Sequence, residues 1–397
     1  MVTHEKYNIV LITLDGLRPD MLTPFLNDLT EKGLFFPTAI TAAPYTVASL
    51  HSVFSALLPR EHGLNGYYKL LSYREGICKT LTEYLQEEGY YCFADVLNTK
   101  VIPSIGFDKI SETKESGKEI TTKHLGHLSK LSELSKSGKP FFFYTQYAHI
   151  HNKLVEDVGK KIDDFDKDFF SSPETQSKRY QEYVLETENY VRAILEQLSR
   201  LSLLSSTLLI FHSDHGASLG EKEGEKMYGS YLFDYTLKSF LLVMGPQVSQ
   251  QTIQTPVSQI DIMPTILDYL NISCSKDYHP LRGRSLLRFQ EGKNEFEEGI
   301  TFSETGGLGG PWPSPEQHNQ FCVRSEKNKV IYNLAEKRYS CYNLTEDPAE
   351  ENELLIDNND SHIVFLQKLL QKTYPEILDA TLGSPTAAED SDLIDDF

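Results

Sequence analysis

Hydrophobic residues along the chain gather in short runs that have the length and composition of β-strands. The run NIVLITL is apolar at nearly every position, which is typical of a strand that is buried on both faces of a sheet. Four further runs have a similar pattern. The predicted strands occupy residues 8–14, 140–148, 206–211, 239–245 and 299–304.

Helical patterns lie between these runs. In residues 178–201, apolar side chains recur at steps of three and four, as on one face of an amphipathic helix. The segments LNDLTEKG and LTEYLQEEGYY predict shorter helices that end at glycine. The alternation of strands and helices indicates an α/β fold with a doubly wound, mostly parallel sheet flanked by helices.

The character of the sequence changes after about residue 290. Residues 306–317 are rich in Gly and Pro and predict a loop, and short strands and a helix near 361–373 follow. We therefore expect a core domain over residues 1–290 and a smaller α+β subdomain with a small antiparallel sheet over 291–375. Residues 376–397 are acidic and poor in apolar side chains, which predicts disorder.

Composition and charge narrow the function classes. The net charge of −19 argues against a nucleic-acid partner, because phosphate contacts need clustered Lys and Arg. No run approaches the roughly 18 apolar residues that span a bilayer, and the N-terminus lacks the pattern of a signal peptide. The five cysteines form no C-x-x-C pair, so we interpret them as reduced residues of a cytoplasmic protein.

Side chains that suit metal chemistry follow three of the predicted strands. Asp15 follows the first of these strands, His149 and His151 follow the second, and Asp214 and His215 follow the third. In open parallel sheets, functional groups gather beyond the carboxyl ends of the strands. Two carboxylates and an imidazole at one sheet edge predict a divalent-cation site. Each motif alone is equally compatible with a helix cap or a polar turn.

Thr46 stands at the front of an uncharged, helix-like stretch over residues 42–59, just after Pro44. The simpler interpretation of Thr46 is a helix N-cap. The alternative is a nucleophile whose hydroxyl is activated by a metal held between Asp15 and Asp214. The N-terminus of the helix would also favour an alkoxide and an anionic ester.

The order of these motifs resembles the sulfatase-like branch of the alkaline phosphatase superfamily, nearly from end to end. The similar segments are NIVLITLDGLRPDML, TPFLNDLTEKGLFFPTAITAAPYT, SALLPREHGLNG, LLIFHSDHGASLGEKEGEK, VSQIDIMPTILDYLNI with LRGRSLL, and YNLTEDPAEENELL. The resemblance implies a doubly wound core and hydrolysis or transfer of a phospho- or sulfo-ester through a covalent enzyme intermediate. It also implies one metal bound by Asp15, Thr46, Asp214 and His215.

Three departures from the family pattern refine this expectation. True sulfatases carry Cys or Ser in a C/S-x-P-x-R signature that is converted to formylglycine, whereas Thr46 is followed by neither the proline nor the arginine. A threonine at the nucleophile position instead makes the sequence similar to the phosphodiesterase branch and to the phosphoglycerol- or phosphoethanolamine-transferase branches. Gly16 replaces a second aspartate, which points to a single cation; we expect Mn²⁺ or Mg²⁺, and Ca²⁺ or Zn²⁺ is compatible. Tyr228 stands where many relatives carry histidine.

The same resemblance places His149 and His151 where relatives hold the anionic group or protonate the leaving oxygen. Lys222 and Lys226 are weaker candidates for substrate contacts, because solvated loop lysines are commoner. We therefore expect a metal-dependent phosphoester hydrolase or phosphotransferase that forms phosphothreonine at Thr46. A sulfatase is the close alternative, and a non-catalytic relative that binds a partner is another. The expected substrate is a small-molecule or glycan-linked phosphate or sulfate ester, and the oligomeric state stays open.

Overall fold

The centre of the molecule is an eight-stranded sheet that carries the predicted strands. The computed structural model describes residues 6–66, 73–114, 117–159, 173–222, 227–291, 299–306, 319–354 and 360–375. In spatial order the sheet contains β10 (Gln251–Thr252), β2 (Leu34–Phe35), β9 (Leu241–Met244), β7 (Thr207–His212), β1 (Asn8–Leu14), β6 (Phe141–Tyr147), β4 (Tyr91–Val96) and β5 (Lys109–Glu112).

The strands at the middle of this sheet are parallel. β1 pairs in parallel with β6 on one side and β7 on the other, so that Ile12 lies between Thr145 and Phe211. β4 continues the parallel pairing to β6 and β5, whereas β9 runs antiparallel to both β7 and β2. The carboxyl ends of β1, β6 and β7 therefore meet at one edge, as the sequence predicts.

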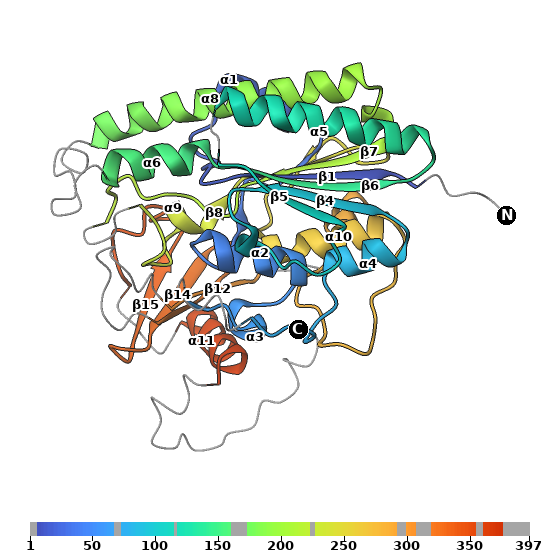
Figure 1. Ribbon diagram of the computed structural model, residues 1–397. Coiled ribbons are helices and arrows are strands. Elements are labelled where there is room, and N and C mark those ends of the chain that lie inside the picture. Colours follow the sequence, from blue (N-terminus) through green and yellow to red (C-terminus); the bar gives the residue numbers. More distant parts are fainter. Residues whose placement is uncertain are drawn as a thin grey trace.

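Helices cover both faces of the sheet (Figure 1). One face is covered by α1 (Pro24–Thr30), α5 (Lys118–Lys136), α6 (His149–Gly159) and α8 (Pro173–Arg200), and the other by α2 (Thr46–Ser55), α4 (Leu81–Glu87) and α10 (Ile262–Tyr269). Successive residues of β1 point to opposite faces, so Val10 and Ile12 join one hydrophobic cluster while Ile9 and Leu11 join the other. The doubly wound α/β fold is thereby confirmed.

Local signals in the sequence start and stop these helices. Thr80 and Glu83 form a capping box at α4, in which the Glu83 carboxylate accepts from the Thr80 amide at 2.8 Å. Thr23 caps α1, and Pro24 occupies its first turn, where no amide hydrogen is needed. α2 ends at Ser55, and the C-cap residue Ala56 has a φ of 52° that turns the chain out of the helix.

A second, antiparallel sheet follows the core domain. It has the order β12 (Thr301–Thr305), β13 (Gln320–Arg324), β14 (Asn328–Asn333) and β15 (Arg338–Asn343), and α11 (Ser361–Thr373) packs against it. A three-stranded sheet of β11 (Val257–Ser258), β3 (Ala39–Ile40) and β8 (Lys238–Ser239) lies beside it. The short helices are α3 (Pro59–His62), α9 (Asp234–Leu237), η2 (Thr99–Val101), η3 (Leu204–Ser206), η4 (Gln259–Asp261) and η5 (Leu286–Glu291).

Buried ion pairs join the small sheet to the core. The Lys329 ammonium on β14 is fully buried and lies 2.5 Å from an Asp234 carboxylate oxygen on α9 and 2.7 Å from the Glu350 carboxylate. Arg324 on β13 lies 3.1 Å from the same aspartate. We name Asp234, Arg324, Lys329 and Glu350 the subdomain ion cluster. Each carboxylate in it has a cation within ion-pair distance.

The structure modifies some of the predicted elements. The strand predicted over 239–245 is divided into β8 and β9, and the helix predicted over 178–201 already begins at Pro173. The loop predicted over 306–317 lies outside the described residues except for its first residue, and the predicted tail over 376–397 lies wholly outside them. The division of the chain at residue 290 stays a prediction. Among the described residues, no helix combines the length and the apolar character that crossing a bilayer would require.

Candidate metal and nucleophile site

Asp15 opens the candidate site at the carboxyl end of β1. Its amide donates to the Tyr147 carbonyl at 3.1 Å, so the chain stays paired to β6 where the carboxylate emerges. The Gln146 side-chain amide donates to Asp15 Oδ2 at 2.7 Å. Gly16 follows with φ of 77°, a conformation that favours glycine, and its amide donates to Asp214 Oδ1 at 3.3 Å. These contacts place Asp15 beside Asp214.

The loop after β7 brings Asp214 and His215 to the same point. The Asp214 carbonyl accepts a hydrogen bond from the Ser49 hydroxyl of α2 at 2.7 Å, which ties this loop to the helix. His215 Nδ1 lies 2.7 Å from the Gly216 carbonyl. Because a carbonyl only accepts, Nδ1 carries the hydrogen, and in the neutral ring Nε2 presents its lone pair. His215 Nε2 lies 3.5 Å from Asp214 Oδ2 and 3.8 Å from Asp15 Oδ1.

Thr46 is the first residue of α2. The N-cap is Tyr45, so the Thr46 hydroxyl does not cap the helix in the way that the simpler interpretation expects. Instead, Thr46 Oγ1 lies 3.3 Å from His215 Nε2. The hydroxyl thus stands at the positive end of a ten-residue helix and next to the two carboxylates.

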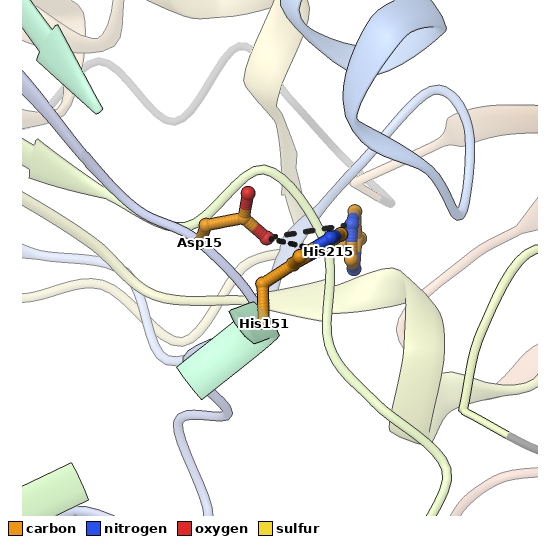
Figure 2. Close-up of side chains that lie close together, drawn as sticks. All are labelled: Asp15, His151 and His215. Atoms are coloured by element: carbon orange, nitrogen blue, oxygen red, sulfur yellow. Dashed lines mark ion pairs between the residues drawn. The ribbon is translucent and has the colours of Figure 1, made fainter. Parts of the chain in front are cut away.

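The two candidate histidines at the start of α6 occupy different surroundings. His151 Nδ1 lies 3.3 Å from Asp15 Oδ1, and Figure 2 shows the ring beside Asp15 and His215. The His149 ring stacks on Tyr147 with a centroid distance of 6.1 Å and meets Tyr183 edge-on. Within the described ranges, no hydrogen bond or ion pair links His149 to Asp15 or Asp214.

The carboxylates of the site have unsatisfied oxygens. Asp15 Oδ1 and Asp214 Oδ2 are buried and have no hydrogen-bond partner in the described part of the chain. An ionised carboxylate in such surroundings is costly unless a positive charge compensates it. Ligand atoms of Asp15, His151 and His215 lie within 4.8 Å of one another, a spacing that a metal ion can bridge. The donor set therefore fits a divalent cation.

The electrostatics of the site reflect this crowding of acids and imidazoles. Burial and the neighbouring Asp15 carboxylate raise the pKa of Asp214. Burial would also raise the pKa of Asp15, but the adjacent His151 and His215 outweigh it and lower that pKa. Burial disfavours the His151 imidazolium, yet the Asp15 carboxylate raises the pKa of His151 overall.

Tyr228 lies over the imidazoles. Its ring stacks on His215 with a centroid distance of 4.5 Å, and its hydroxyl lies 3.5 Å from His151 Nε2. Lys222 points elsewhere: its ammonium donates to the Glu350 carbonyl. Lys226 lies outside the described residues.

One neighbour of the site, Gln146, escapes the sequence analysis, and the contact made by a second, Tyr228, is not predicted there. Gln146 holds Asp15 but lies inside a continuous apolar strand, where a single amide gives little signal. Its position could have revealed it, since Gln146 is the penultimate residue of β6, close to the strand end that leads to His149. Tyr228 stands out in the sequence as a replacement, and its stacking on His215 appears only in the structure.

Comparison with known proteins shows the family of the chain. The profile of the family described as Sulfatase matches residues 7–272, and the chain belongs to this family. Arylsulfatase K of Mus musculus is 29% identical over 45% of this chain and 28% of its own length. The low-salt glycan biosynthesis sulfotransferase Agl7 of Haloferax volcanii is 25% identical over 66% of this chain and 60% of its own length. The chain thus matches less than two thirds of either relative.

Solved structures share the fold over nearly the whole chain. A protein in complex with its substrate D-glucosamine-2-N,6-O-disulfate superposes with a TM-score of 0.74 at 16% identity, covering 94% of this chain and 98% of the other. The phosphonate monoester hydrolase of Agrobacterium radiobacter gives a TM-score of 0.69 at 15% identity, with coverage of 95% and 96%. At these identities the likeness is one of fold.

Proposed function

We propose that the chain is a metal-dependent enzyme that cleaves or transfers sulfate or phosphate esters, with Thr46 as its nucleophile. The observation that carries this proposal is the Thr46 hydroxyl at a helix N-terminus, 3.3 Å from His215 Nε2, beside two buried carboxylates with unsatisfied oxygens. Membership of the Sulfatase family supports ester chemistry at this site.

The proposed metal ligands are Asp15 Oδ1, Asp214 Oδ2, His215 Nε2 and Thr46 Oγ1, and the position of His151 Nδ1 fits a further ligand. When bound, the cation would lower the pKa of the Thr46 hydroxyl and offset the charge of the ester. Two imidazoles suit Mn²⁺ or Zn²⁺ better than Ca²⁺, and Mg²⁺ stays compatible with the carboxylates.

The chain's own residues supply the nucleophile and its orientation. The bond from Thr46 Oγ1 to phosphorus or sulfur forms while the bond to the ester oxygen breaks. The threonine loses its proton and the departing oxygen gains one, so a free alcohol leaves. Water, or an acceptor alcohol, then attacks the same atom, breaks its bond to Oγ1 and returns a proton to Thr46. The N-terminus of α2 stabilises the anionic group throughout.

We assign contact with the bound ester to His151 rather than His149. His151 borders Asp15, whereas His149 packs against Tyr147 and Tyr183. Replacement of each by Ala tests the assignment with a substrate that has a poor leaving group. We expect a loss of on the order of 10²-fold in kcat for the His151 variant, and little change for the His149 variant.

Transfer to an acceptor is a second candidate for the final step. The name of the Haloferax volcanii relative includes glycan biosynthesis and sulfotransferase, and this supports a glycan acceptor or substrate. The proposal covers both sulfate and phosphate esters. The residues after Thr46 lack the proline and the arginine of the signature that directs conversion to formylglycine, so the sequence does not mark a sulfatase of that type. A non-catalytic binding protein is the remaining alternative.

The deciding experiment combines metal analysis with a substrate panel. The protein is loaded in turn with Mn²⁺, Mg²⁺, Ca²⁺ and Zn²⁺ and offered aryl sulfates, phosphodiesters and phosphomonoesters, with and without an acceptor sugar. Mass spectrometry of the peptide that contains Thr46 then detects the trapped sulfo- or phospho-group. Absence of turnover with every metal, together with absence of bound metal, would favour the non-catalytic alternative.

A further inference from the structure

Gln146 is buried beside the candidate metal site and makes a directed contact with one of its carboxylates. It is the penultimate residue of β6, it is 2% exposed, and its side-chain amide donates to Asp15 Oδ2 at 2.7 Å. A carboxylate accepts hydrogen bonds and cannot donate them, so the nitrogen of the amide faces Asp15. The contact is a buried hydrogen bond to a charged group, which is stronger than a bond between neutral groups.

The two oxygens of Asp15 have different surroundings. Oδ2 is held by Gln146, whereas Oδ1 lies 3.3 Å from His151 Nδ1 and 3.8 Å from His215 Nε2. Figure 2 shows the contacts to both imidazoles meeting at a single oxygen of Asp15. One oxygen of this carboxylate therefore faces the candidate metal site, and the other is bonded to β6.

Asp214 shows the same division between its two oxygens. Its Oδ1 accepts from the Gly16 amide at 3.3 Å, and its Oδ2 lies 3.5 Å from His215 Nε2. Each aspartate thus presents one oxygen to the imidazole, while an amide holds the other. The amide at Asp214 belongs to the backbone, but the amide at Asp15 belongs to the Gln146 side chain and can be removed by substitution.

The number of oxygens that a carboxylate offers affects which cation it suits. Ca²⁺ takes about six to eight oxygen ligands in a flexible geometry and accepts carboxylates through one oxygen or through both. Mg²⁺ demands a nearly ideal octahedral arrangement, and Mn²⁺ also favours octahedral sites. A donor bonded to Oδ2 competes with binding through both oxygens. It therefore disfavours the larger coordination number that is open to Ca²⁺.

We propose that Gln146 is a positioning residue, which holds Asp15 as a single-oxygen ligand and thereby favours Mn²⁺ or Mg²⁺ over Ca²⁺. The inference rests on the proposed function, because it concerns the ligands of the proposed metal site. Its tests measure the bound cation and require no ester.

The first test uses the unaltered chain. A crystal structure of the protein with Mn²⁺ should show Asp15 bound to the cation through Oδ1 alone, with Oδ2 still within hydrogen-bond distance of the Gln146 side-chain nitrogen. Coordination through both oxygens of Asp15 would overturn the inference. A Gln146 amide turned away from Asp15 in the presence of the cation would overturn it as well.

The second test removes the donor. Gln146→Met keeps an unbranched side chain of similar length but has no amide. The matched control is Gln197→Met on α8, because Gln197 is 9% exposed and also donates at 2.7 Å, to the neutral Ser129 hydroxyl on α5. Calorimetry gives the Kd of Mn²⁺ and of Ca²⁺ for both variants and for the unaltered chain. Urea unfolding without metal shows that each variant is folded, and Gln146→Leu replaces the Met variant if that one is not.

We expect Gln146→Met to raise the Kd of Mn²⁺ by roughly 10- to 100-fold, as is typical when a group that orients a metal ligand is lost. The Kd of Ca²⁺ should rise by about threefold or less, because the released Oδ2 becomes available to this cation. Gln197→Met should leave both values within about twofold of the unaltered chain. An unchanged Kd of Mn²⁺ in Gln146→Met would overturn the positioning role, and equal increases for the two cations would overturn the cation preference.

These measurements separate the inference from the proposed catalysis. A protein that shows the expected affinities but turns over no ester would refute the catalysis and uphold the role of Gln146. A protein that turns over an ester but binds Mn²⁺ equally well with and without the Gln146 amide would uphold the catalysis and overturn the inference.

Discussion

The candidate site and the subdomain ion cluster both bury carboxylates, but they compensate the charge in different ways. In the cluster, Lys329 lies within 2.7 Å of carboxylate oxygens of both Asp234 and Glu350. In the site, the described groups within ion-pair distance of Asp15 Oδ1 and Asp214 Oδ2 are the imidazoles of His151 and His215, and no Lys or Arg of the described residues pairs with either carboxylate. Buried charges normally have a partner. The subdomain ion cluster is matched, because Lys and Arg pair with its carboxylates, and it links the small sheet to the core. The site carboxylates are unmatched in this sense, which indicates a place for a cation.

The largest expected effect breaks the catalytic side of this comparison. Thr46→Ala should lower kcat/KM by on the order of 10³-fold or more, because the nucleophile is lost. The free energy of unfolding should change by about 1 kcal/mol or less, because Tyr45, and not Thr46, is the N-cap of α2. Steady-state kinetics and urea unfolding measure the two quantities. Thr46→Ser should keep part of the activity, and normal turnover by the Ala variant would refute the mechanism.

Residues at strand ends could be predicted from the sequence because continuous apolar runs lead directly into them. Asp15 follows β1, and Asp214 and His215 follow β7, so parallel pairing alone brings these side chains to one edge. The amphipathic pattern of α8 was equally clear, because its periodicity extends over many turns.

The distinction between His149 and His151 could not be read from the sequence. Both follow β6, but α6 begins at His149, and side chains two residues apart on a helix point about 200° apart. The sequence also could not predict where the Lys222 side chain points, because its ammonium donates to the carbonyl of Glu350, 128 residues away. Pairings at such separation depend on how the small sheet docks on the core, and no local pattern encodes that.

Breaking the matched cluster should cost stability and leave metal binding intact. Lys329→Met removes a fully buried cation and leaves Glu350 without its closest one, so we expect the free energy of unfolding to fall by about 3–5 kcal/mol. The control is Arg338→Met, which breaks the largely exposed pair with Glu353 and should cost at most about 1 kcal/mol. Urea unfolding of both variants gives the comparison. Similar losses in the two would show that burial of the cluster is unimportant.

The unmatched carboxylates should respond to metal instead. Removing the metal with a chelator should lower the free energy of unfolding, and adding Mn²⁺ at about 100 times its Kd should restore about 2.7 kcal/mol. Asp214→Asn is the control: it should abolish the metal response. Without metal, this variant should be at least as stable as the unaltered chain, since it removes a buried like charge beside Asp15. An equal metal response in both proteins would place the cation elsewhere.

Glu304 on β12 offers a third way of burying a carboxyl group, since no cation of the described residues lies within ion-pair distance of it. It is 1% exposed, and no donor of the described residues bonds either oxygen in good geometry, although Tyr374 and Arg60 lie nearby. Burial raises the pKa of Glu304 to about 8 from 4.5, so the folded protein holds a proton that the unfolded chain releases.

The stabilisation that the protonated Glu304 gives to the folded protein is fully present below the pKa of the unfolded chain, and it is lost as the pH rises toward about 8. Between these values the free energy of unfolding should fall by up to about 1.4 kcal/mol per pH unit from this group alone. Glu304→Gln keeps a neutral side chain of the same shape, so the slope of stability against pH should become flatter above about pH 5. Urea unfolding across this range measures the slope for both proteins. An unchanged slope would mean that Glu304 is ionised when folded and that an unrecognised positive group compensates it.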